Sequence, residues 1–453
     1  MIPNLQPYPE YKESGLPWLR QMPAHWGIKR GKSVFQSIDQ RSATGKEELL
    51  TVSSARGVVP RRTASVTMFK AESYLGYKLC WPGDLVINSL WAWGGGLGVS
   101  RYHGIISSAY GVYRIRSGAP LIPDYVHELV RSSAFHWELQ VRSKGVWISR
   151  LQLTDDSFLD APIPLPPPEE QAAMVRFLDY ANARLEQAVR AKRKVIALLH
   201  EQKQAIIHRA VTRGLDPTVP LKPSGIPWLG DIPKHWGVSR VKNEFRCLNT
   251  QRIPLNSVER GQMTSRLYDY YGASGVIDKV DDYLFDDELL LIAEDGANLV
   301  LRNLPLAIIA RGKFWVNNHA HILKPKRGNI VYLANYLETL NYMAWISGAA
   351  QPKLTQDRLL SISIAVAPPE EQDAIVEHTT REAQPLLNAI SRLEREISLL
   401  REYRTRLVAD VVTGKLDVRG VTLPAKSEPP AALGAETIEQ DSSEPEEAEN
   451  PSD

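Results

Sequence analysis

The motif Pro167-Pro168-Glu169-Glu170-Gln171 occurs a second time as Pro368-Pro369-Glu370-Glu371-Gln372, and this repetition decides the fold. Two shorter motifs upstream of each copy are also doubled. They are Ser14-Gly15-Leu16-Pro17-Trp18-Leu19 with Ser224-Gly225-Ile226-Pro227-Trp228-Leu229, and Pro23-x-His25-Trp26-Gly27 with Pro233-x-His235-Trp236-Gly237. Several motifs that recur in one order indicate an internal repeat. Each half of the chain therefore contains an entry motif, a variable segment, the PPEEQ motif and a helix.

The segments between Trp26 and Pro167 and between Trp236 and Pro368 differ in sequence but share a pattern. Each contains short β-rich runs interrupted by glycine and then a helical stretch. The predicted strands are 84–88, 110–115, 289–293 and 320–323, and the predicted helices are 125–141 and 330–345. This pattern predicts two mixed α/β modules of one fold that carry different surfaces.

After each PPEEQ motif, apolar residues recur mostly three, four or seven positions apart, in a narrow stripe typical of a coiled-coil seam. About 45 residues at a rise of 1.5 Å per residue predict a rod of about 65 Å. The first helix is expected to end near Gly214 and the second near Gly414. Pro385 should kink the second helix or mark its start.

A rod of this length is expected to bury its stripe against the other helix. If the two helices pack antiparallel, the second returns the chain to the first module. The chain is then nearly circular and pseudo-twofold symmetric, and residue 14 is expected to lie near residue 416. Two dissimilar modules on a stiff spacer suit the recognition of two half-sites on duplex DNA, which is itself pseudo-twofold symmetric.

The charge of the chain is unevenly distributed. The formal net charge is +2, but Pro424–Asp453 contains nine acidic residues and one lysine. The remainder carries a modest positive excess, which favours a polyanionic partner. The tail is too polar and too rich in proline to fold, so we expect a disordered end, with a regulatory mimic of DNA charge as the alternative.

Two cysteines, Cys80 and Cys247, are too few for a disulfide framework and lack the spacing of a zinc site. The N-terminus has no basic and apolar signal pattern, and no run approaches eighteen apolar residues. These features predict a cytoplasmic protein without a metal site or a membrane span.

The sequence lacks the motifs of an amino-methyltransferase and of an ATP-driven motor. No glycine-rich loop is followed by the Asn/Asp-Pro-Pro-aromatic motif of an amino-methyltransferase, and no Gly-x4-Gly-Lys-Ser/Thr motif is present. The sequence predicts no catalytic residue and no cofactor bound by this chain. The alternatives are a self-sufficient restriction or methylation enzyme and an assembly scaffold whose modules bind proteins.

Reading of bases requires Arg, Lys, Asn or Gln side chains at groove edges, and aromatic residues often flank them. In the first module the candidates are Arg56, Arg61, Arg62, Trp91, Trp93, Arg101 and Tyr102, with Lys70 beside them. In the second module they are Arg266, Tyr270, Tyr271, Asn298, Arg302, Asn317, Asn318, His319 and Lys353. For Asn317–His319 the alternative is a buried polar turn that shapes the fold.

The doubled aromatic motifs favour a structural role. Trp18, His25 and Trp26 return as Trp228, His235 and Trp236. A ligand or metal site is one interpretation of these residues. We expect instead an aromatic and proline clasp that seats each module on the ends of the helices.

The whole arrangement resembles the specificity subunit of type I restriction–modification systems, over roughly residues 10–418. The stretches Trp315–His321 and Gly348–Thr355 also look like the target recognition domains of this family. The first module departs from the family at Ile106–Tyr110 and Ser143–Trp147. The resemblance implies an α+β fold in which two mixed α/β target-recognition domains are joined by two long antiparallel helices, packed as a coiled coil.

The resemblance divides the chain into five parts. They are a first target recognition domain (1–165), a first spacer helix (166–214), a second target recognition domain (215–366), a second spacer helix (367–418) and an acidic disordered tail (419–453). It implies a non-catalytic subunit that reads a bipartite, asymmetric duplex target. Its partners would be two methyltransferase subunits on the helical spacer, which methylate adenine, and two restriction/translocase subunits. S-adenosylmethionine, ATP and Mg would be bound by these partners.

Overall fold

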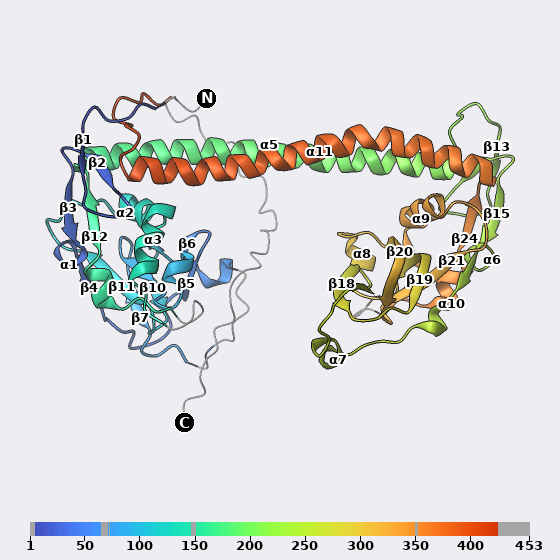
Figure 1. The fold of residues 1–453 in the computed structure, drawn as a ribbon, viewed down its shortest axis with the longest axis horizontal. Helices are drawn as coiled ribbons and strands as arrows, with labels where there is room; N and C mark the ends of the chain where they lie inside the picture. Colours follow the sequence, from blue (N-terminus) through green and yellow to red (C-terminus); the bar gives the residue numbers. More distant parts are fainter. Residues whose placement is uncertain (1–4, 65–70, 72, 146–150, 349–351, 425–453) are drawn as a thin grey trace. The chain divides into compact units, whose positions relative to one another are not determined.

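The computed structural model describes residues 5–64, 71, 73–145, 151–348 and 352–424. The chain divides into two compact units, residues 1–191 with 395–453, and residues 192–394. Two long helices, α5 (Pro168–Arg213) and α11 (Pro369–Val412), run from one unit into the other (Figure 1). Each begins with the second proline of a PPEEQ motif, where the missing N–H of proline leaves no bond unmade. Lys70, Trp147, residues 349–351 and the tail from 425, which the sequence analysis singled out, lie outside the described residues.

The first unit consists mainly of small antiparallel sheets. Its strands are β1 (Tyr11–Glu13), β2 (Gln21–Pro23), β3 (Gly27–Arg30), β4 (Phe35–Ser37), β5 (Leu50–Ser53), β6 (Gly57–Pro60), β7 (Lys78–Cys80), β8 (Leu85–Ile87), β9 (Leu97–Val99), β10 (Gly104–Ile106), β11 (Gly111–Ile115) and β12 (Pro162–Leu165). The largest sheet has the order β4-β11-β8-β9, and β1-β2, β3-β12, β5-β6 and β7-β10 pair separately. Its short helices are α1 (Gly31–Val34), α2 (Pro123–Val130), α3 (Ser133–Arg142) and α4 (Asp155–Leu159), with 3-10 turns η1 (Arg61–Thr63) and η2 (Ala92–Gly94).

The second unit contains a six-stranded sheet of order β16-β21-β19-β20-β17-β18. These strands are β16 (Phe245–Cys247), β17 (Tyr268–Gly272), β18 (Gly275–Val280), β19 (Phe285–Ala293), β20 (Ala307–Val316) and β21 (Ala320–Pro325). The pair β17-β20 is parallel and the other neighbours are antiparallel. The remaining strands pair as β13 (Leu221–Pro223) with β14 (Asp231–Pro233), β15 (Gly237–Arg240) with β24 (Ser363–Val366), and β22 (Ile346–Ser347) with β23 (Lys353–Leu354). Its short helices are α6 (Val241–Glu244), α7 (Ser257–Gly261), α8 (Asn298–Leu301), α9 (Ile330–Thr339) and α10 (Gln356–Ser361), with 3-10 turns η4 (Asn249–Gln251) and η5 (Tyr342–Ala344).

The two units share a frame around their PPEEQ motifs. In each, a hairpin precedes a strand that pairs antiparallel with the strand leading into the long helix, as Gly27↔Leu165 in one unit and Gly237↔Val366 in the other. Between these frame strands the two sheets differ in strand number and order. The common frame accounts for the repeated motifs, and the different sheets account for the divergent segments between them.

The two long helices pack on each other inside each unit. In the first unit, Met174 and Phe177 of α5 share a core with Leu407 and Val411 of α11, and Arg404 bonds Glu186 at 2.8 Å. In the second unit, the end of α5 shares a core with the start of α11. The beginning of each helix therefore contacts the end of the other, which is an antiparallel arrangement.

The two ends of the folded chain meet in the first unit, as the near-circular arrangement predicts. The Tyr11 hydroxyl donates to the Lys415 carbonyl at 3.1 Å, and the Asp417 amide donates to the Gln6 carbonyl at 2.8 Å. The predicted proximity of residue 14 to residue 416 is confirmed by these contacts.

Two predictions about helices need correction, and one of the two alternatives for Pro385 is excluded. The stretch 125–141 forms two helices rather than one, because Ser132 is extended and its hydroxyl caps α3 by accepting from the Phe135 amide. The stretch 330–345 ends as α9 at Thr339, where Leu340 becomes extended, and continues only as the turn η5. Pro385 lies inside α11 and does not mark its start.

Candidate nucleic-acid interface

The first unit is fastened to its long helix by the second glutamate of the PPEEQ motif. Glu170, whose side chain is almost buried, accepts a hydrogen bond from Trp26 Nε1 at 3.0 Å and lies 2.6 Å from His25 Nε2. The Tyr8 hydroxyl donates to the same carboxylate at 3.2 Å, and Arg419 approaches it at 3.5 Å. Burial, and then the neighbouring carboxylate of Glu170, raise the pKa of Tyr8, so this hydroxyl stays a donor.

The second unit repeats this junction with fewer members. Glu371 accepts from Trp236 Nε1 at 2.9 Å and lies 2.7 Å from His235 Nε2. The clasp predicted from the doubled motifs is thus confirmed for the His-Trp pairs. Trp18 packs edge-to-face on Phe135 at 5.4 Å between ring centroids, outside the carboxylate junction. A ligand is not needed to satisfy the His-Trp pairs, because a carboxylate bonds the ring nitrogen of each, whereas Trp18 Nε1 is buried without a hydrogen-bond partner among the described residues.

The glutamine of each PPEEQ motif fastens a second loop. Gln171 donates to the carbonyls of Pro120 and Pro166 and accepts from the Ile122 amide, each at 2.8 Å. Gln372 donates to the Ala367 carbonyl and accepts from the Asn329 amide, also at 2.8 Å. Both side chains are buried. Each glutamine therefore fixes the loop that leads into the helix packed beside the sheet, α2 or α9.

In the first unit, Arg56, Arg61 and Arg62 lie together on the β5-β6 hairpin and the turn η1 that follows it. Arg56 donates to the Thr63 carbonyl at 2.6 Å, and Arg62 pairs with Glu48 at 2.9 Å. Both of these side chains are exposed. The hairpin thus presents a basic surface of the kind that contacts phosphates.

The two tryptophans of the first unit lie on a second loop. Trp91 and Trp93 meet in an edge-on arrangement, 4.6 Å between ring centroids, at the start of the glycine-rich loop 94–98. Arg101 and Tyr102 follow β9 on the next turn, and Arg101 approaches Asp124 at 3.6 Å. Both Arg101 and Tyr102 are exposed, while the two indoles are half-buried.

Arg131, which the sequence reasoning did not single out, connects these two loops. Its guanidinium donates to the Leu97 carbonyl of the glycine-rich loop at 2.7 Å and to the Ser54 carbonyl of the hairpin turn at 2.6 Å. Burial lowers the pKa of Arg131. A single half-buried cation therefore connects the candidate loops, and no sequence pattern marks an arginine that bonds to backbone carbonyls.

The second unit brings Asn317, Asn318, His319 and Lys353 together at one corner of its sheet. The Glu294 amide donates to the His319 carbonyl at 2.9 Å, and Lys353 pairs with Glu294 at 3.2 Å. Asn318 and His319 are exposed, whereas Asn317 is buried and accepts from the His319 amide at 2.8 Å. The buried-turn interpretation thus holds for Asn317, and the exposed one for its two neighbours.

The other candidates of the second unit lie elsewhere, and two have structural roles. Tyr270 is 1% exposed and its hydroxyl accepts from the Leu255 amide at 3.1 Å, so burial removes it from the candidate surface. Arg302 donates to the carbonyls of Leu340 and Glu338 and so fixes the end of α9.

The remaining three candidates occupy separate positions in the second unit. Tyr271 is half-buried, and packs edge-to-face on Phe314. The side-chain amide of Asn298 donates to the Leu304 carbonyl and accepts from the Leu304 backbone amide. Arg266 is exposed in a turn whose amide donates to Asp281.

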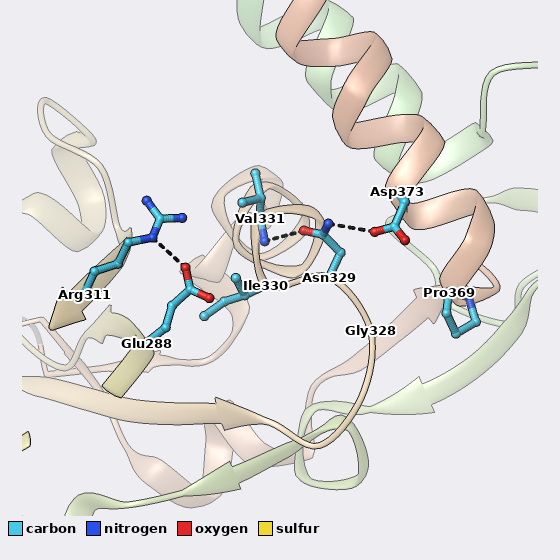
Figure 2. A pocket seen from close by; sticks show the side chains of 8 residues that line it. All are labelled: Glu288, Arg311, Gly328, Asn329, Ile330, Val331, Pro369 and Asp373. Carbon is cyan, nitrogen blue, oxygen red and sulfur yellow. Dashed lines mark hydrogen bonds and ion pairs between the residues drawn. The ribbon is translucent and has the colours of Figure 1, made fainter. Parts of the chain in front are cut away.

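A separate pocket of about 470 Å³ lies at the N-terminal ends of α9 and α11 in the second unit (Figure 2). Its lining charges already pair, since Arg311 Nε lies 2.5 Å from Glu288 Oε1. The Asn329 side chain bridges the two helices, donating to Asp373 at 2.8 Å and accepting from the Val331 amide. The predicted DNA contacts do not lie among the residues that line this pocket.

The described residues contain neither a metal cluster nor a candidate membrane span. Within these ranges no group of three or more His, Cys, Asp or Glu side chains is placed to hold a metal ion. In the part of the chain that the structure describes, no helix is both long enough and apolar enough to span a membrane. Cys80 and Cys247 are free thiols.

The chain contains two modules that share one frame, and a PPEEQ carboxylate fastens each module to its own long helix. This arrangement defines a class of protein with two related modules. Residues 233–381 match the Type I restriction modification DNA specificity domain. A type I restriction enzyme specificity subunit of Haemophilus influenzae is 37% identical over 131 residues, which are 28% of this chain and 32% of the relative. The MjaX specificity subunit of Methanocaldococcus jannaschii is 26% identical over 271 residues, 57% of this chain and 60% of the relative.

A solved chain from a study of complex assembly and conformational transition of the type I R-M system has the same fold. Its TM-score is 0.59 at 15% identity, and the match covers 86% of this chain and 98% of that chain. The family match places a type I restriction modification DNA specificity domain at residues 233–381, and the chain matches 32% and 60% of the lengths of the two curated relatives.

Proposed function

We propose that this chain is a non-catalytic subunit that binds duplex DNA at a bipartite, asymmetric target. The observation that carries this proposal is the doubled junction, in which Glu170 and Glu371 each fasten a different module to a long helix. Equivalent fastening presents the two modules to DNA in equivalent ways, and their different sheets provide different reading surfaces. The antiparallel contacts of α5 and α11 support a coiled-coil spacer that sets the distance between the half-sites, with the two halves related by a pseudo-twofold axis.

The partners in this proposal follow from the family. Two methyltransferase subunits would bind the helical spacer and methylate adenine, and two restriction/translocase subunits would join them. These partners would supply the sites for S-adenosylmethionine, ATP and Mg. The complex would act in the cytoplasm, where chromosomal DNA and these cofactors occur together.

The decisive experiment uses the purified full-length chain to select duplexes from a randomised pool, at two salt concentrations. We expect enrichment of one sequence made of two fixed parts with an unspecified gap, and a steep fall in affinity with salt because phosphate contacts release counterions. An assembly scaffold would enrich no sequence and would show no steep salt dependence. Transfer of labelled methyl groups to DNA by the chain alone would refute the non-catalytic assignment.

A further inference from the structure

Three turns of the second unit meet at one corner of the six-stranded sheet. The turn after β19 donates from the Gly296 amide to the Pro352 carbonyl at 3.1 Å. The Leu354 amide donates back to the Glu294 carbonyl at 2.8 Å, and the Glu294 amide donates to the His319 carbonyl at 2.9 Å. Residues 294–296, 317–319 and 352–354, hereafter the three-turn corner, are therefore held as one body by backbone hydrogen bonds.

A buried histidine fixes the inside of the three-turn corner. His321 Nε2 lies 2.7 Å from the Leu354 carbonyl, and its Nδ1 lies 2.8 Å from the side-chain nitrogen of Asn249. The carbonyl accepts only, so Nε2 carries the hydrogen, and Nδ1 accepts from Asn249. Burial lowers the pKa of His321, which keeps the ring neutral. The inside of the corner is thus fixed by a neutral ring that is hydrogen-bonded through both of its nitrogens.

The cations of the corner are engaged in its own structure. Arg252 pairs with Glu294 at 2.6 Å and also donates to the Ala320 carbonyl at 2.9 Å. Lys353 pairs with the same carboxylate at 3.2 Å. Burial raises the pKa of Glu294, but the hydrogen bond from Arg252 and the nearby positive charges outweigh it and keep the carboxylate ionised. The corner is therefore close to charge balance, which makes it a poor site for a phosphate and a better site for a base edge.

One side chain projects from this corner with an unused polar atom. The His319 side chain is 46% exposed, and its Nδ1 lies 2.8 and 2.9 Å from the two oxygens of Asp295. A carboxylate only accepts, so Nδ1 carries the hydrogen, and Nε2 presents a lone pair when the ring carries no second proton. Among the described residues, Nε2 has no hydrogen-bond partner. The backbone amide of His319 is held by Asn317, so the ring is fixed at both its root and its inner edge.

We propose that His319 reads the exocyclic amino group of an adenine or cytosine in the major groove, with Nε2 as the acceptor and Asp295 as the positioning residue. In the major groove the amino groups of adenine and cytosine are the donors, whereas guanine and thymine present acceptors at the corresponding positions. An oriented acceptor therefore discriminates between these two pairs of bases. This inference rests on the proposed function and names the chemistry of one contact in the half-site read by the second module.

The test is duplex selection with the full-length chain and four variants. His319→Ala removes the acceptor, His319→Gln keeps an acceptor oxygen, and Asp295→Ala frees the ring from its orientation. Val258→Ala, an exposed apolar side chain on α7, is the control. We expect His319→Ala to lose about five- to tenfold of the preference at one base position, the value of one hydrogen bond, with the rest of the target unchanged. His319→Gln should retain part of this preference, and Asp295→Ala should weaken it.

The outcomes separate the inference from the function on which it rests. An unchanged base preference in His319→Ala overturns the inference while the bipartite target stands. A uniform loss of affinity for all sequences would identify a phosphate contact and overturn it as well. A wild-type chain that enriches no sequence overturns both proposals. Thermal unfolding of each variant at the wild-type temperature establishes that the fold is retained.

Discussion

Replacing Glu170 by alanine should loosen the first unit from its long helix. The substitution removes the acceptor of Tyr8, His25 and Trp26, whereas Arg419 keeps its hydrogen bonds to Asp417. His25 and Arg419 are 40% exposed and are rehydrated, whereas Tyr8 and Trp26 are buried. A buried donor without a partner costs about 1–3 kcal/mol, so two give a loss of about 2–6 kcal/mol in the local free energy of opening.

Hydrogen exchange measured by mass spectrometry provides the assay. A loss of this size lowers the protection of backbone amides in β2, β3 and the start of α5 by about thirtyfold or more, since about 1.4 kcal/mol is a factor of ten. The corresponding change at Glu371 leaves only Trp236 buried without a partner, because His235 is 45% exposed. It should cost about 1–3 kcal/mol.

The matched control is Glu169→Ala, which alters the neighbouring exposed carboxylate in the same helical turn. It removes only a favourable charge at the helix N-terminus, worth about 0.3–1 kcal/mol. Equal loss of protection in Glu169→Ala and Glu170→Ala would show that helix charge, rather than the junction, holds the unit, and would refute the reasoning.

Three further predictions concern the modules, the spacer and pH. Replacement of residues 237–366 by the module of another family member should change one half-site in a methylome and leave the other; a change in both would refute independent reading. Insertion of a few residues into α5 should alter the gap between half-sites in the same measurement, and an unchanged gap would refute the spacer. His127 lies in α2, and burial lowers its pKa to about 4 in the folded protein, against about 6.5 in the unfolded chain. Between these two pH values the unfolded chain therefore binds more protons than the folded protein. Stability should therefore be fully present above pH 6.5 and fall by about 3 kcal/mol towards pH 4 in urea titrations, and His127→Gln should remove this part of the pH dependence.

The frame of the protein was predictable because it depends on local and repeated signals. The PPEEQ motifs place proline at a helix start and predict α5 and α11, and Gly214 and Gly414 have the positive φ that ends such helices. The apolar stripes predicted that the helices bury a face. The break at Ser132 was missed because a capping serine inside a helical pattern has little effect on its periodicity.

The candidate surface was predictable only in part. His319 and Arg62 were chosen as candidates because their residue types suit recognition of DNA, and both side chains are exposed. Asp295 and Arg131 were missed, since each acts through a partner distant in sequence, and Tyr270 was misjudged because an aromatic residue on a strand points to the core or to solvent according to register. Such assignments depend on tertiary packing, which no local pattern contains.

The division of the chain has a consequence for the order in which the protein is made. The second unit is contiguous, so its whole sequence has been synthesised before residue 395 is added. The first unit takes Leu407, Val411 and Val418 into its core, and these residues are translated after the whole of the second unit. The first unit can therefore complete its core only after the end of α11 has been synthesised. The second unit can fold as it emerges from the ribosome.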